Sequence, residues 1–83
     1  MEEANPTWIE QVQAHFGSFN YHEFDQNTLR MTSRSSDIII TRDPGNDMYT
    51  INGYRVYGMG GQKRTHRWNN QNAPSLEAVY ILI

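Results

Sequence analysis

The middle of the chain, residues 37–57, reads DIIITRDPGNDMYTINGYRVY and carries the strongest indications of fold class. Ile38, Ile39 and Ile40 are β-branched and stiff at χ1, which favours a strand over a helix. An uninterrupted apolar run is typical of a strand that is covered on both faces. The sequence therefore predicts that residues 37–42 form a central strand.

Two turn signals divide the rest of this stretch. Residues 43–47 combine proline, glycine and Asx side chains, which is the residue chemistry of a turn. Asn52-Gly53 is a strong signal for a two-residue β-hairpin, with strands over 48–51 and 54–57. One side of this hairpin is then expected to carry four large side chains, Tyr49, Ile51, Tyr54 and Val56.

A further strand is expected before the isoleucines. Residues 28–34 alternate, with Leu29 and Met31 on one side and polar residues on the other, which is the period of a strand. Residues 18–27 are predicted to form a loop that leads into a short strand and ends in a turn at Asn27.

The N-terminal segment has the pattern of a helix over residues 6–16. Asn5 suits the N-cap, Pro6 suits the first helical position, and Gly17 stands where a C-terminal glycine belongs. Four apolar residues recur at helical spacing and predict a core-facing side: Trp8, Ile9, Val12 and Phe16.

After residue 57, glycines at 58, 60 and 61 are expected to end the sheet, and the polar stretch 62–72 reads as a loop. A second helix is predicted to begin after Ser75, because apolar residues follow at helical spacing. The β-branched residues Val79, Ile81 and Ile83 favour a strand as the alternative.

The sequence thus predicts an α+β fold for residues 1–83, taken as a single small domain. We expect an N-terminal helix, a three- to four-stranded antiparallel meander and a C-terminal helix, with both helices on one face of a single-layer sheet. This αβββα-like order resembles that of the double-stranded-RNA-binding domain, in which a basic cluster opens the last helix. Here Pro74 and an Asn/Gln-rich stretch separate the basic cluster from Ser75, so the resemblance covers element order alone.

Composition narrows the classes of function. The absence of cysteine excludes disulfides, thiolate zinc sites and cysteine nucleophiles. The acidic start does not read as a signal peptide, and no apolar run approaches the ~20 residues of a membrane span. We therefore expect a cytoplasmic protein without a membrane partner.

Catalytic and metal-binding patterns are weak. His15, His22 and His66 have no metal-ligand spacing, and Glu23 with Asp25 would need a cleft to act as an acid–base pair. The glycine-rich stretch 58–64 lacks the GK[ST] ending of a phosphate loop. We expect no enzymatic activity, no cofactor and no metal site.

Charge is distributed unevenly along the chain. Residues 1–29 hold five acids and no Lys or Arg, whereas residues 30–83 hold seven bases and four acids. Residues 63–68, KRTHRW, place bases beside an aromatic ring, as single-strand or phosphate binding requires. The residues expected to bind a partner are Arg55, Tyr57, Lys63, Arg64, Arg67 and Trp68.

Two hypotheses of function follow. The first is a protein-binding module, a small regulator or inhibitor that docks on a larger protein or nucleoprotein complex, because Trp, Tyr and Arg are the usual interface hot spots. Small chains of this type are common among phage and mobile-element accessory proteins that act on host machinery. The alternative is a nucleic-acid-binding domain that uses the basic segment 63–68.

Overall fold

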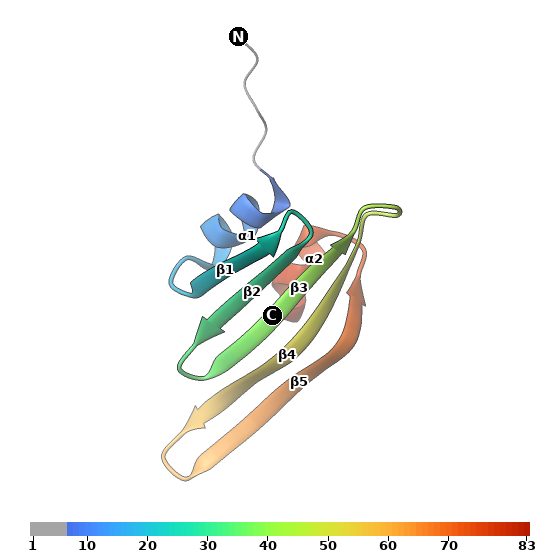
Figure 1. The fold of residues 1–83 in the computed structure, drawn as a ribbon. Helices are drawn as coiled ribbons and strands as arrows, with labels where there is room; N and C mark the ends of the chain where they lie inside the picture. Colours follow the sequence, from blue (N-terminus) through green and yellow to red (C-terminus); the bar gives the residue numbers. More distant parts are fainter. Residues whose placement is uncertain (1–6) are drawn as a thin grey trace.

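The structure, a computed structural model, describes residues 7–83, apart from the side chain of Met59. The elements in these residues are, in chain order, α1 (Trp8–Phe16), β1 (Asn20–Asp25), β2 (Thr28–Ser33), β3 (Ser36–Asp43), β4 (Met48–Met59), β5 (Gln62–Ala73) and α2 (Leu76–Leu82) (Figure 1).

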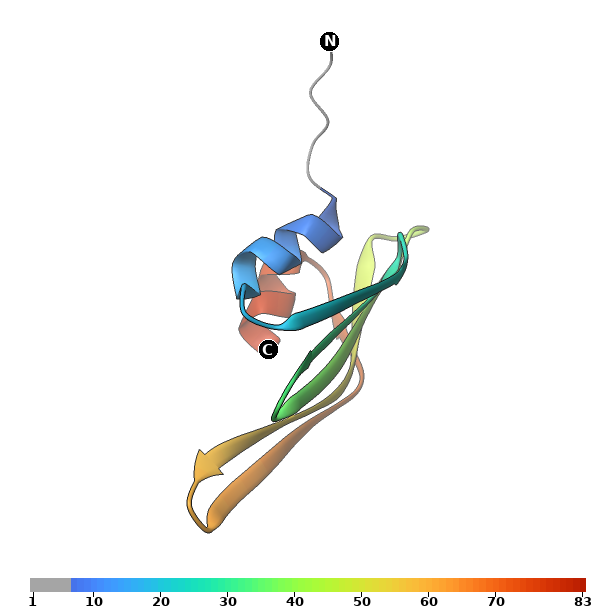
Figure 2. The same ribbon diagram turned by 60° about the vertical axis from the view of Figure 1, so that its left-hand side comes forward.

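The strands form one antiparallel sheet in the order β1-β2-β3-β4-β5, so each strand pairs with its neighbour in the chain. Both helices lie on the same side of the sheet, and no other element of residues 7–83 covers the opposite side, called here the open face (Figure 2). The α+β class with a helix at each end is confirmed. The expected three to four strands are too few, because the described residues form five.

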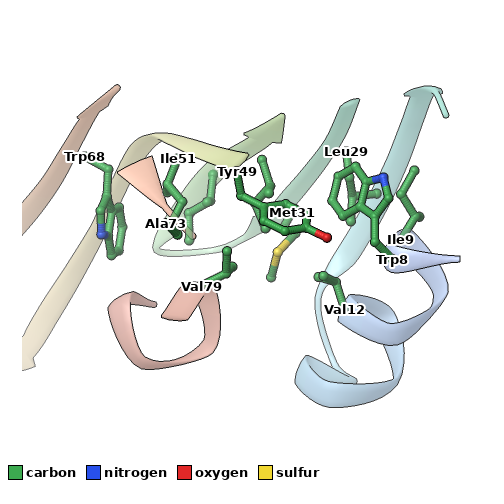
Figure 3. Close-up of a cluster of buried hydrophobic side chains, with 12 residues drawn as sticks. Trp8, Ile9, Val12, Leu29, Met31, Tyr49, Ile51, Trp68, Ala73 and Val79 are labelled. Carbon is green, nitrogen blue, oxygen red and sulfur yellow. The ribbon is translucent and has the colours of Figure 1, made fainter. Parts of the chain in front are cut away.

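The hydrophobic core fills the space between the helices and the sheet (Figure 3). Leu29 and Met31 of β2 lie in register with Ile40 and Ile38 of β3, and all four side chains are fully buried. The helices close this layer with Trp8, Ile9, Val12 and Val79. The expected burial of Trp8 and Val12 is confirmed, and the indole N–H of Trp8 donates to the main-chain oxygen of Gln26 at 2.9 Å.

The helix ends follow local capping chemistry. In α1, the side chain of Thr7 accepts a hydrogen bond from the main-chain N–H of Glu10, so Thr7 is the N-cap and the helix begins at Trp8. The expected cap Asn5 and first residue Pro6 lie outside the described residues. Ser75 caps α2 in the same way, which confirms the terminal helix over its strand alternative.

The hairpin expected at Asn52-Gly53 is wrong, because β4 runs straight through these residues. Gly53 pairs with Ile38 on one side and with Trp68 on the other. The side chain of Asn52 accepts a hydrogen bond from the N–H of Asn70 at 2.8 Å, across a β-bulge in which two residues of β5 lie opposite one of β4. Asn52-Gly53 therefore supports a bulge.

Continuity of β4 also corrects the side chains assigned to each face. Tyr49 and Ile51 are buried under the helices, whereas Tyr54 and Val56 lie on the open face. The actual reversal connects Met59 to Gln62 through Gly60 and Gly61.

Residues 62–72 form most of β5 and are not a loop. Only Trp68 and Ala73 of this strand are buried, so its exposed residues show no alternation between apolar and polar side chains. Its pairing with β4 is what makes this segment a strand.

The expectation that β3 is covered on both faces is wrong. Ile39 is only half-buried on the open face, so β3 is a central strand that is covered on one face.

Gly53 is a position where only glycine fits. Its φ is 129°, and a Cβ atom there would lie 2.0 Å from the main-chain oxygen of Asp37. We expect Gly53→Ala to lower the free energy of unfolding by more than about 2 kcal/mol, through backbone strain and separation of β3 from β4. Urea denaturation measures the change.

Gly61→Ala is the matched control, since a Cβ atom at Gly61 meets no atom within 4 Å. It should unfold at nearly the wild-type urea concentration. Equal stability of the two variants would contradict the close contact between β3 and β4 at Gly53.

Candidate functional site

β4 and β5 extend beyond the rest of the sheet as a two-stranded ribbon. Pairing between β3 and β4 reaches Ser36 opposite Arg55, and the N–H of Val56 donates to the oxygen of Ser35 at 2.8 Å. Beyond this point the two strands pair only with each other, as far as Met59 opposite Gln62. We call residues 56–65 the β arm; it projects at the lower left of Figure 1 and past the helices in Figure 2.

A glycine permits the pairing inside the β arm. Gly58 has a φ of 118°, and a Cβ atom there would lie 1.9 Å from the main-chain oxygen of Gln62. The sequence signal at this position was read as the end of the sheet. It instead marks a close approach of two strands.

Charge is separated along the sheet. The sequence of β4 and β5, including their connection, contains four bases and no acid. Acidic residues gather at the opposite end, where Asp25 ends β1 and where Asp43 and Asp47 flank the β3–β4 turn. The basic pole of the molecule is therefore the β arm and its base.

The predicted partner-binding residues do not share one face. Side chains alternate along a strand, so Arg64 lies on the helix side of the sheet together with Trp68. Arg55 and Tyr57 of β4 also lie on the helix side, where they are the cross-strand neighbours of His66 and Arg64 of β5. Lys63 and Arg67 lie on the open face. The structure therefore places cations on both faces of the ribbon.

Arg55 has a structural role at the base of the β arm. Its guanidinium lies 5.3 Å from the ring centre of Tyr57 and 5.9 Å from that of Phe19. It also donates a hydrogen bond to the main-chain oxygen of Ile83 at 3.3 Å. Arg55 thus connects the sheet to the segments that directly follow α1 and α2. The exposed cations of the site are Lys63, Arg64 and Arg67.

Arg67 has an aromatic neighbour that the sequence interpretation did not identify. Its guanidinium lies 5.8 Å from the ring centre of Tyr54, which is opposite Arg67 on the open face. Tyr54 is exposed. The mistaken hairpin had placed Tyr54 on the side of Ile51, which concealed this pair.

Trp68 belongs to the core and not to the surface. Only 3% of it is exposed, and it points to the same side of the sheet as Ile51 and Val79 (Figure 3). The rings of Trp68 and His66 meet edge to face at 4.6 Å. The basic segment 63–68 therefore lacks the stacking platform that its tryptophan was expected to provide.

The other arginines contribute less to a positive surface. Arg30 makes two hydrogen bonds to Asp37, at 2.9 and 2.5 Å, and Arg42 is paired with Asp47. Their charge is locally neutralised. Arg34 is exposed in the β2–β3 turn, beside the base of the β arm.

The side chains that could act in acid–base catalysis or metal binding do not lie together. His15 stacks on Tyr80 at 3.8 Å between ring centres, and His22 lies on the open face beside Phe24. A surface hollow beside Trp8 is lined by neither carboxylates nor imidazoles. Within residues 7–83, no three His, Asp or Glu side chains are grouped to hold a metal ion, and no helix could span a bilayer.

Comparison with protein-family models, with curated proteins and with solved structures finds no significant match for this chain. The functional interpretation therefore rests on the geometry and charge of the β arm itself.

Burial of Trp68 has a direct test. We expect Trp68→Ala to lower the free energy of unfolding by about 3–5 kcal/mol, because the truncation leaves a cavity beneath β5. Urea denaturation followed by circular dichroism measures this change. Unfolding at the wild-type urea concentration would instead place the indole on the surface.

The Arg30–Asp37 pair predicts a pH dependence of stability. Hydrogen bonds from Arg30 hold the pKa of the Asp37 carboxyl below its usual value. A carboxyl whose pKa is lower in the folded state stabilises the fold at neutral pH and loses this contribution as pH falls through the folded-state pKa. Asp37→Asn should therefore melt below wild type at pH 7, and the gap should narrow below about pH 4. A gap that is constant down to pH 2 would contradict the assignment.

Proposed function

We propose that this chain is a non-enzymatic binding module, a small regulator or inhibitor that docks on a larger protein or nucleoprotein complex through its β arm. The observation that supports it is a projecting two-stranded ribbon whose strands carry four bases and no acid. Such a ribbon suits a negatively charged recess in a partner.

The shape of the β arm favours insertion over flat docking. Stable flat interfaces bury about 800 Å² on each partner and usually have an apolar centre. Among the side chains that the structure describes, the two exposed rings at the arm lie on opposite faces, Tyr54 on the open face and Tyr57 on the helix side, so they do not form one apolar patch. A recess contacts both faces of the ribbon at once.

The protein scaffold supports this use of the β arm. Arg55 ties the base of the arm to the helical layer, and the pairing of β4 with β5 continues to Met59. A ribbon that is ordered before binding loses less conformational entropy when it docks. The proposal includes the role of a phage or mobile-element accessory protein, whose β arm would occupy a site on a protein complex of the host cell.

Charge removal at the β arm tests the proposal. The tagged protein is used for pull-down from a lysate of the cells in which it acts, beside a Lys63→Gln/Arg64→Gln double variant. Both side chains are exposed, so the variant should fold normally. We expect it to lose at least about 90% of the bound partner, because two of the three exposed cations of the site are gone.

Arg42→Gln is the control, since Arg42 lies at the opposite end of the sheet and is paired with Asp47. It should retain the partner at the wild-type level. Equal recovery by wild type and the double variant, with matching circular dichroism spectra, would refute docking through the β arm.

A further inference from the structure

The geometry of the β arm points to one class of partner. We infer that the β arm binds double-stranded DNA by entering the major groove, with its cations directed at the phosphates on both walls. This inference rests on the proposed function and names the ligand of the same site.

The dimensions of the β arm agree with those of the groove. Four pairs lie beyond the sheet, Val56–Thr65, Tyr57–Arg64, Gly58–Lys63 and Met59–Gln62, which at about 3.3 Å per residue is a projection of about 13 Å. The major groove of B-form DNA is about 12 Å wide and about 8.5 Å deep, and it admits a two-stranded β-ribbon.

The distribution of charge favours a groove over a flat acidic surface. Arg64 lies on one face of the ribbon, and Lys63 and Arg67 lie on the other. A flat acidic patch meets only one face, whereas the phosphate rows beside a groove can meet both. The strands contain no acid that either row would repel.

The rest of the molecule favours approach with the β arm first. Asp25, Asp43 and Asp47 lie at the far end of the sheet from the arm tip. A polyanion repels this end and attracts the other, so the charge separation orients the protein before contact. The sequence pI of about 5.8 is thus compatible with DNA binding, because these three acids lie away from the arm tip and Asp37, nearer the arm, is paired with Arg30.

Other nucleic acids suit the β arm less well. The major groove of A-form RNA is deep and too narrow for side chains to read. Single strands are held by stacking their bases on aromatic platforms, and Trp68, the ring expected to stack, is buried. These differences provide controls for the experiment.

The test measures binding of the full chain to a labelled 20-base-pair DNA duplex by fluorescence anisotropy between 50 and 200 mM salt. Three exposed cations predict a slope of log affinity against log salt of about −2.7, or about a 40-fold loss over this range. We expect weaker binding to an RNA duplex and to a single strand of equal length. Methyl green, a major-groove ligand, should displace the protein, whereas the minor-groove ligand netropsin should not.

Variants locate the contact. Lys63→Gln/Arg64→Gln leaves Arg67 as the one exposed cation of the site. The slope of log affinity against log salt should therefore fall to about −0.9, and the affinity at 50 mM salt should fall at least tenfold. Arg42→Gln should keep the wild-type slope and affinity, although it also removes one positive charge.

Three results would overturn the inference: no binding to the duplex at 50 mM salt, equal affinity for duplex and single strand, or the same slope in wild type and the double variant. The proposed function fails separately. If a partner survives nuclease treatment of the lysate and still requires Lys63 and Arg64, the β arm binds protein, and only the DNA assignment is wrong.

Discussion

The pairing of β4 on both of its edges is the constraint on which the rest of this structure depends. β4 lies between β3 and β5, and Gly53 allows its backbone to approach that of β3 where any side chain would collide. The bulge opposite Asn52 shifts the register of β5, so that both Trp68 and Ala73 face the helices. Without this shift, one of these two residues would point to the open face, because side chains alternate along a strand.

The same pairing creates the candidate site. β3 begins at Ser36, opposite Arg55, whereas β4 and β5 extend past this level, so their pairing also projects beyond the sheet as the β arm. An edge strand that is long and unpaired invites association with other chains, and charged side chains are a common protection against it. β5 is an edge strand with exposed charged side chains of this kind, which also form the basic pole of the molecule.

Local chemistry explains which parts of the fold were predictable. Sequence patterns identified both helices, the turn at 43–47 and the strand over the isoleucines, because caps, turn residues and periodicity act within a few residues. β5 was missed because ten of its twelve side chains are exposed, which removes the alternation that marks a strand. Asn52-Gly53 was misread because the same dipeptide suits a hairpin turn and a bulge, and only the partner strands distinguish the two.

The sequence predicted which residue types make up the candidate site, but not how their side chains are arranged on the sheet. By itself the sequence determined the α+β class, the two helices, the strand over the isoleucines and the collection of bases after residue 54, since these depend on side-chain type and short-range spacing. Only the tertiary structure decided that Trp68 is in the core, that Arg55 anchors the helical layer, and that Lys63 and Arg64 lie on opposite faces of a projecting ribbon. The reason is that strand register, which assigns each side chain to a face, is set by pairing between distant segments.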